Sequence, residues 1–236
     1  MTVHASFDRF SKKRGDIFAV EDLTFDVPAG SIVGLIGPNG AGKSTALAGL
    51  TGLLEPSTGR ATVFGSNYRS LTRPATKVGV HLDGMDFEPG LTGRRHLKIC
   101  QLAAGTRPDS IDRVLEQVDL VDNAEKKIRD YSLGMKQRLG IASAVIGSPS
   151  LLILDEPANG LDPDGIQWLR TFLREFAESG GSELVSSHQL SELQQIADEV
   201  VIMKQRMLFH GSLEEAMAFG SGSLEDAYFR ILEGAR

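Results

Sequence analysis

Residues 37–45, GPNGAGKST, match the spacing G-x-x-x-x-G-K-[ST], which brings a lysine and two hydroxyls to the end of a glycine-rich turn. An apolar stretch precedes the turn and a helix-forming stretch follows it. Backbone N–H groups of residues 39–45 and the positive end of that helix would ring a phosphate, because glycine lets the main chain come close. We therefore predict a nucleotide-phosphate site formed by Gly37, Pro38, Asn39, Gly40, Ala41, Gly42, Lys43, Ser44 and Thr45.

Three of these side chains have expected roles at such a site. Lys43 would contact the β and γ phosphates, Ser44 would give its hydroxyl to Mg²⁺, and Thr45 would lie on the α-phosphate side. The alternative is a glycine-rich turn with an incidental lysine, and the flanking strand and helix disfavour it.

Two acids end another apolar stretch, LLILDEP. Asp155 and Glu156 would lie at the carboxyl end of a central strand, where α/β sheets bind their ligands. Asp155 suits a water-mediated contact with Mg²⁺, and Glu156 suits the activation of a water for attack on the γ phosphorus. Such a pair can also merely cap the next turn, an alternative that the phosphate motif disfavours.

A histidine, His188 in VSSHQL, follows a further apolar strand. It could hydrogen-bond the γ phosphate or orient the attacking water, although a single histidine at a strand end is more often structural. Its position two elements after Asp155, in a chain that already has the phosphate motif, favours the catalytic role.

The elements that must position these residues follow from hydrophobic periodicity. Strands are expected in residues 17–27, 31–36 and 61–65, with a helix from residue 43 between the last two. Beyond residue 150, strands and helices alternate, and they are expected at 151–155, 165–179, 182–187, 190–198 and 199–203, followed by a hairpin to 212 and a small helix after the glycines at 220 and 222. This order predicts an α/β fold with a largely parallel sheet covered on both faces.

A helical insertion is expected from about residue 92 to 145. Thr92 and Asp109 are predicted N-caps. One helix face is predicted from apolar residues at i, i+3, i+4 and i+7, namely Ile111, Val114, Leu115 and Val118.

Composition narrows the classes of function. The formal net charge of the 236 residues is −6 and the basic residues are thinly spread, which disfavours a nucleic-acid partner. Cys100 is the only cysteine, which excludes an intrachain disulfide framework and a Cys-based zinc cluster and favours the cytoplasm. There is no signal peptide and no apolar run of the roughly eighteen residues that a spanning helix needs, so we expect the chain not to cross a membrane.

The motifs together resemble those of the nucleotide-binding subunits of ABC transporters. The resemblance covers nearly the whole chain and includes YSLGMKQRLGIA before LLILDEP, NGLD just after it and SSH further on. The segments YSLGMKQRL, VGVHLDG and SLEDAYFRIL are most similar to the ATPase subunits of bacterial drug and antibiotic exporters. The resemblance implies a P-loop NTPase (RecA-like) parallel-sheet core with an antiparallel β subdomain and an inserted α-helical subdomain. The expected divisions are 1–82 and 146–220 for the core with the β subdomain, 83–145 for the helical subdomain and 221–236 for a C-terminal helix.

By the same resemblance, residues 132–135 are the signature motif, whose chemistry belongs to another subunit. Ser132 and Gly134 open a helix that would face a γ phosphate bound by a partner chain, flanked by Leu133 and Met135. Two identical chains, or two paired ATPase subunits, would associate on ATP binding and form two composite sites, with Asp162 of NGLD at their interface. An ordinary serine N-cap is the structural interpretation of the same residues, and the two are compatible.

The sequence departs from the family pattern near the metal and in the signature motif. Leu133 and Met135 stand where glycine and glutamine are usual. Asp83 stands where a metal-contacting glutamine is usual, and its carboxylate is an oxygen ligand that Mg²⁺ accepts.

The adenine contact departs from the pattern as well. Arg14 replaces the usual stacking aromatic, and a guanidinium plane can also stack on a base. Phe18 and Phe10 are the other candidates.

The function that the resemblance implies is hydrolysis of ATP, with Mg²⁺, by a dimer that drives a separate integral membrane permease. The cargo would be an exported drug, antibiotic or peptide-like compound. The chain would lie on the cytoplasmic face of the cell membrane, with residues 84–97 facing the permease through Phe87, Pro89 and Leu91.

A non-hydrolysing regulatory cassette is an alternative that the presence of Glu156 and His188 disfavours. Two other functions are disfavoured as well. One is a soluble ABC ATPase acting on ribosomes or DNA, which the lack of a second cassette, of long heptads and of a basic surface disfavours. The other is a P-loop kinase or GTPase, which would leave SLGMKQ unexplained and would need an N-K-x-D motif for guanine that the sequence lacks.

Overall fold

One sheet runs through the molecule. The computed structural model describes residues 2–84, 86–107 and 110–234. In those residues the strands are β1 (Val3–Arg14), β2 (Ile17–Pro28), β3 (Ile32–Ile36), β4 (Thr58–Val63), β5 (Val78–His81), β6 (Leu151–Asp155), β7 (Ser182–Ser187), β8 (Glu199–Lys204) and β9 (Arg206–Ser212). Their order in the sheet is β4-β1-β2-β9-β8-β3-β7-β6-β5.

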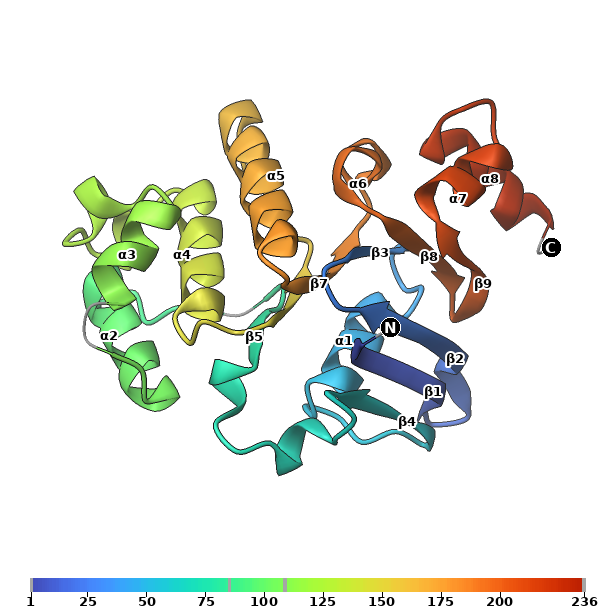
Figure 1. Cartoon of the computed structure of the whole chain (residues 1–236), viewed down its shortest axis with the longest axis horizontal. Coiled ribbons are helices and arrows are strands. Elements are labelled where there is room, and N and C mark those ends of the chain that lie inside the picture. Colours follow the sequence, from blue (N-terminus) through green and yellow to red (C-terminus); the bar gives the residue numbers. More distant parts are fainter. Residues whose placement is uncertain (1, 85, 108–109, 235–236) are drawn as a thin grey trace.

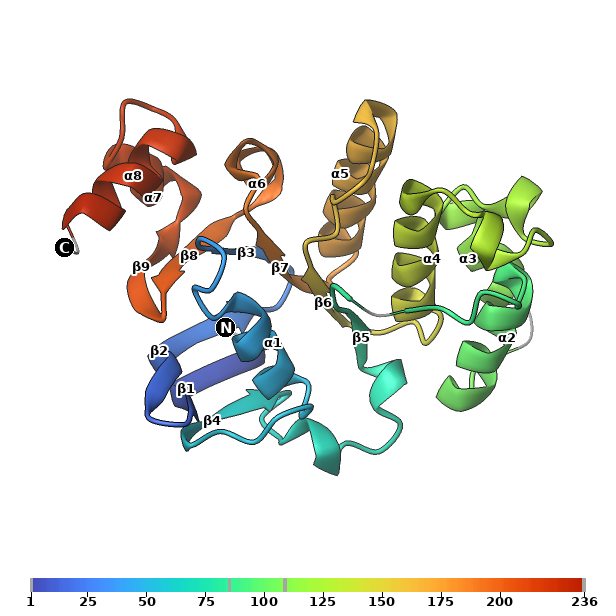
Figure 2. The same ribbon diagram turned by 180° about the vertical axis from the view of Figure 1, so that it is seen from behind.

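The helices lie at both ends of the molecule and over the middle of the sheet (Figures 1 and 2). They are α1 (Lys43–Leu50), α2 (Gly93–Ala104), α3 (Ser110–Gln117), α4 (Leu133–Val145), α5 (Pro163–Glu178), α6 (Leu190–Ile196), α7 (Leu213–Ala218) and α8 (Leu224–Gly234). In both views α2, α3 and α4 lie at one end of the molecule and α7 and α8 at the other. Among the described residues no helix is long and apolar enough to span a bilayer.

The central strands are parallel and buried on both faces. β3 pairs in parallel with β7 and β8, and β6 pairs in parallel with β5 and β7. Alternate residues of β3 enter two separate cores, because side chains of a strand point to opposite faces. Ile32 and Ile36 pack with residues of α5 and α6, whereas Val33 and Leu35 pack with residues of α1. The predicted parallel sheet covered on both faces is confirmed, and its strands end at one common edge.

The antiparallel part of the sheet contains a strand that the hydrophobic pattern did not predict. β1 pairs antiparallel with β2 and with β4. Register shifts interrupt the pairing with β2, and Arg9 within the shifted stretch has a φ of 48°. These irregularities break the alternation of apolar and polar residues on which a prediction depends. The strand β5 was not predicted either, because it is only four residues long.

The helical insertion is confirmed between two neighbouring strands. β5 and β6 pair with each other, and the chain between them forms α2, α3 and α4. Thr92 caps α2 as predicted, its Oγ1 accepting from the Arg95 N–H at 3.2 Å. The predicted apolar face of α3 and its following turn is buried, while Asp109, the other predicted cap, lies outside the described residues.

A carboxyl group is buried in the centre of the sheet. Glu183 of β7 has no exposed surface, and its two side-chain oxygens find no hydrogen-bond partner among the described residues. Burial, in the vicinity of the opposing charges of Arg174 and Asp198, raises the pKa of Glu183 to about 9. The group is therefore protonated in the folded chain at neutral pH.

This burial predicts a pH-dependent loss of stability. The folded-state pKa lies above the ordinary value of 4.5, so the favourable contribution is complete below pH 4.5 and declines as the pH rises towards about 9. Each pH unit in that window costs at most about 1.4 kcal/mol of unfolding free energy. Glu183→Gln removes the titrating group, and urea unfolding between pH 6 and 8.5 should show a flatter pH dependence than wild type.

The matched control is Glu178→Gln, which changes an exposed carboxyl on α5. It should leave the pH dependence of unfolding unchanged. If the unfolding free energies of wild type and Glu183→Gln changed with pH in the same way, the assignment of a neutral buried carboxyl would be contradicted.

Candidate functional site

The glycine-rich loop connects the end of β3 to the start of α1. The Ala41 N–H donates to the Pro38 carbonyl at 3.0 Å, which closes a turn. Gly42 has a φ of 101°, and a Cβ there would lie 2.4 Å from the Ala19 carbonyl oxygen. Only glycine fits such a position, so the loop lies tightly against β2 and delivers the chain directly into α1.

A pocket of about 280 Å³ opens over this loop. It is lined by the loop, the carboxyl end of β6, the turn after β5 and the end of β1, through Arg14, Ala19, Pro38, Asn39, Gly40, Ala41, Gly42, Lys43, Ser44, Thr45, Asp83, Asp155 and Glu156. Gly37, the first residue of the predicted motif, is buried and gives its carbonyl to the Lys43 amine at 2.7 Å. The structure thus brings the phosphate loop, both predicted acids and Asp83 into one pocket, called here the P-loop pocket.

Glu156 joins the phosphate loop to the turn after β7. Its Oε1 lies 3.5 Å from the Lys43 Nζ, and both side chains are nearly buried. Its Oε2 lies 2.7 Å from His188 Nδ1 and accepts from the His188 backbone N–H at 3.3 Å. Both carboxylate oxygens are therefore engaged, one by the loop and one by the histidine. Half of the His188 side chain is exposed (52%), so the imidazole remains available to a ligand.

The backbone of Glu156 adopts the left-handed region, with a φ of 50°. Residues other than glycine rarely take this conformation. Two hydrogen bonds hold it: the Glu156 N–H donates to the carbonyl and to the hydroxyl of Ser186 at 3.1 and 3.2 Å. The chain therefore turns sharply at the end of β6, and the turn aims the carboxylate at Lys43 and His188.

Oxygen ligands of the kind that Mg²⁺ accepts also line the P-loop pocket. Asp155 is buried, and the Ser186 hydroxyl donates to its Oδ1. Ser44 and Asp83 are exposed and line the same pocket. Among the described residues no group of three or more histidines, cysteines and acids could hold a metal.

Ser186 is a site residue that sequence reasoning missed. It pairs with Asp155 across β6 and β7 and contacts both acids. Ser186 is the first residue of the SSH segment, so the sequence did mark it. Its contacts with the two acids, however, arise only because β6 and β7, which lie far apart in the sequence, pair with each other.

The three residues predicted as candidates for stacking on the adenine lie in different places. Arg14 lines the P-loop pocket. Phe18 is not among the described residues that line it, and the Lys13 Nζ lies 4.5 Å from the centre of its ring. Phe10 is fully buried in the core beneath α1, so it cannot stack on a base.

The signature motif lies away from the P-loop pocket of its own chain. Ser132 caps α4, its Oγ accepting from the Met135 N–H at 3.2 Å, and Asp162 caps α5 through the Gly165 N–H at 2.8 Å. Within the described part of the chain, no residue from 132 to 135 lines the P-loop pocket. Ser132 and Asp162 are both exposed.

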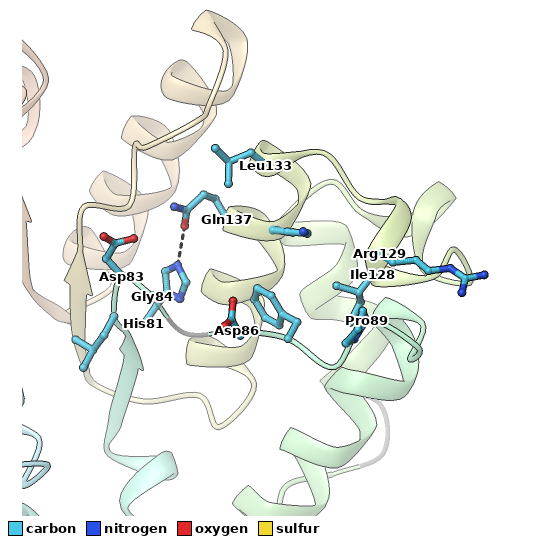
Figure 3. A pocket seen from close by; sticks show the side chains of 12 residues that line it. His81, Asp83, Gly84, Asp86, Pro89, Ile128, Arg129, Leu133 and Gln137 are labelled. Atoms are coloured by element: carbon cyan, nitrogen blue, oxygen red, sulfur yellow. Dashed lines mark hydrogen bonds between the residues drawn. The ribbon is translucent and has the colours of Figure 1, made fainter.

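A second pocket, of about 290 Å³, lies between the turn after β5 and the start of α4 (Figure 3). It is called here the α4 pocket, and its lining includes Asp83, Phe87, Pro89, Leu133 and Lys136. Asp83 lines both pockets, so the two cavities meet at this residue.

A buried polar pair in the α4 pocket was also missed by sequence reasoning. His81 Nε2 lies 2.7 Å from Gln137 Oε1, and both residues are buried. Burial lowers the pKa of His81, so the ring is neutral at neutral pH and its N–H can donate to the amide. The available signal was a histidine inside an apolar strand, which requires a buried partner.

Known proteins with similar sequences and structures agree on one family. Residues 20–159 match the family described as ABC transporter. The chain is 42% identical over 201 residues to the bacitracin transport ATP-binding protein BcrA of Enterococcus faecalis, covering 84% of this chain and 65% of BcrA. It is 38% identical over 187 residues to the lantibiotic transport ATP-binding protein SrtF of Streptococcus pyogenes, covering 79% of this chain and 81% of SrtF. The chain thus spans slightly less than two thirds of the length of BcrA.

A solved structure described as the ATP binding subunit of an ABC transporter superposes with a TM-score of 0.89 at 28% identity, covering 97% of this chain and 99% of that one. This agreement confirms the predicted P-loop NTPase fold. With the family match, the similar sequences and the similar structure in accord, the chain belongs to the ABC transporter family.

Proposed function

We propose that this chain is an ATP-hydrolysing subunit that pairs with a second ATPase subunit and drives a separate integral membrane permease. The observation that carries the proposal is the position of Glu156, which lies in the P-loop pocket and contacts the lysine of the phosphate loop with one oxygen and His188 with the other. A phosphate loop alone would support binding, whereas a carboxylate fixed beside it supports hydrolysis.

Hydrolysis follows from the charges in the P-loop pocket. When ATP enters, its phosphates replace Glu156 as the partner of the Lys43 ammonium, because a triphosphate carries more negative charge than one carboxylate. Glu156 then accepts a proton from the water that attacks the γ phosphorus. His188 keeps the carboxylate oriented through its contact with Oε2 and can also donate to the γ phosphate.

Mg²⁺ is the proposed cofactor. Ser44, Asp155 and Asp83 would hold it, and it would neutralise charge on the β and γ phosphates. The hydrogen bond from Ser186 fixes the Asp155 carboxylate for this task.

A second chain is proposed because each subunit keeps its signature motif outside its own P-loop pocket. The helix that begins after Ser132 has an exposed amino end, and the positive end of its dipole suits a phosphate bound by another subunit. Two-fold pairing would place both signature motifs over both P-loop pockets, with Asp162 at the interface.

The proposed cargo is an exported antibiotic, drug or peptide-like compound. Support comes from the similar proteins, which are named for bacitracin and lantibiotic transport. Through the permease, the subunit would lie at the cytoplasmic face of the cell membrane. We propose the α4 pocket as the permease contact, since Phe87 and Pro89, which were expected to face the permease, both line it.

The hydrolytic role predicts the behaviour of Glu156→Gln. The amide keeps the size of the side chain but cannot accept the proton, so turnover should fall by about 10²-fold or more. ATP binding should persist, and the uncleaved nucleotide should hold two subunits together. ATPase assays and sedimentation velocity with and without ATP measure both effects.

Lys43→Ala is the contrasting variant, which should lose ATP binding and remain monomeric with ATP. Unchanged hydrolysis by Glu156→Gln would remove Glu156 as the base. A Glu156→Gln chain that binds ATP and stays monomeric would instead contradict the pairing.

The permease contact predicts a separation of transport from hydrolysis. Phe87→Ala removes an apolar ring that lines the α4 pocket and not the P-loop pocket. The isolated variant should hydrolyse ATP at about the wild-type rate, whereas co-purification of a membrane protein with the tagged chain from membranes should be lost, since buried aromatics carry much of the binding energy of an interface.

Phe229→Ala, which changes an exposed aromatic on α8, is the matched control and should co-purify the same membrane protein as wild type. Equal co-purification by Phe87→Ala would place the permease contact elsewhere.

A further inference from the structure

Leu133, the first residue of α4, contacts the loop that follows the candidate base. The side chain is 60% exposed, yet its end lies on the backbone of Gly160. A Cβ added to Gly160 would be 2.2 Å from Leu133 Cδ2 and 2.4 Å from Leu133 Cγ. Leu133 therefore fills the space that any side chain at position 160 would need.

The contact extends over two successive residues of α4. A Cβ added to Gly134 would lie 3.3 Å from the Gly160 carbonyl oxygen and 3.6 Å from Leu161 Cδ2. The start of α4 is thus packed on the turn at residues 160–161. Figure 3 shows Leu133 at this end of α4, while the bond between Gln137 and His81 anchors the helix one turn further on.

The turn beneath Leu133 is directly connected to Glu156. The Asn159 N–H donates to the Glu156 carbonyl at 3.1 Å, and the Leu161 N–H donates to the Ala158 carbonyl at 3.2 Å. The next residue, Asp162, caps α5. Residues 156–162 therefore form a compact, hydrogen-bonded loop from the candidate base to the start of α5.

We propose that Leu133 is a positioning residue, which holds the signature motif and the loop at 156–162 of one chain as a single surface for a second chain. This role rests on the proposed pairing of two subunits. Because the contact orders both segments before they meet a partner, less conformational entropy is lost on association. This role explains why a leucine stands at position 133, where the family resemblance leads us to expect glycine. Residue 160 must then be glycine, because Leu133 fills the space of a side chain there.

A double-mutant cycle tests the contact. In the Glu156→Gln background, Leu133→Ala loosens the start of α4 and should weaken ATP-driven pairing by roughly 5-fold or more. Gly160→Ala places a methyl group against Leu133 and should weaken pairing at least as much. In the double variant the methyl group no longer meets Leu133 Cδ2 and Cγ, although its 3.2 Å approach to the Cβ at position 133 and the strain of a side chain at a φ of 76° remain. Pairing should therefore be at least about 3-fold tighter than the product of the two single effects, which is the coupling expected of residues in contact.

Two further measurements separate this role from the proposed function. Nucleotide affinity of the dilute, monomeric chain should stay at the wild-type value in all three variants, because neither residue lines the P-loop pocket. In the nucleotide-free chain, Leu133→Ala should speed hydrogen exchange at the amides of Lys136 and Leu161, whether or not the chain pairs.

The outcomes are distinguishable. A parent chain that stays monomeric with ATP overturns the proposed pairing and with it this role of Leu133. A parent that pairs, with purely multiplicative effects of the two substitutions or with unchanged exchange in Leu133→Ala, overturns the proposal for Leu133 alone. Non-multiplicative effects together with faster exchange support it.

Discussion

The contact of one carboxylate with two cationic or polar partners organises the site. Glu156 reaches the Lys43 ammonium with one oxygen and His188 with the other. These three residues follow β6, β3 and β7, which are adjacent and parallel, so their carboxyl ends meet at one edge of the sheet. The left-handed turn at Glu156, fixed by Ser186, then points the carboxylate along that edge instead of away from it. The sheet therefore brings residues from three separate sequence motifs into contact with one another.

Much of the P-loop pocket could be predicted because its determinants are local. The phosphate loop follows from glycine, lysine and hydroxyl spacing between a strand and a helix, and the caps Ser132 and Thr92 follow from a polar residue placed before a helix. The motifs, the helical insertion and the strands of the parallel core could therefore be predicted from the sequence, because each depends on residues that are close together along the chain.

The features that could not be predicted depend on contacts between residues that are far apart in the sequence. His81 and Gln137 are 56 residues apart, and their bond exists only because α4 packs beside β5. Phe10 was a candidate base contact, but the pairing of β1 with β2 and β4 turns it into the core. The carboxyl of Glu183 lies among apolar strands without a partner in the described residues, and nothing in the SELVSS pattern distinguishes it from a residue at an exposed strand end.

The P-loop pocket is the part of the molecule proposed to bind nucleotide, and the α4 pocket and the exposed caps are the parts proposed to meet other chains. Asp83 belongs to both pockets, and α4 places Leu133 and Gln137 in the α4 pocket. The turn after β5 and the start of α4 therefore lie between the P-loop pocket and the two proposed contact surfaces.

We propose that each hydrolytic site takes its phosphate loop from one chain and its signature motif from another. The most direct measurement is the ATPase rate of a mixture of two inactive chains, one carrying Lys43→Ala and the other Gly134→Asp. Pairing of the two creates one site with an intact loop and an intact signature motif, so the mixture should hydrolyse ATP although neither chain does so alone. A mixture that pairs and stays inactive, or a Gly134→Asp chain that hydrolyses ATP at the wild-type rate by itself, would contradict the composite site.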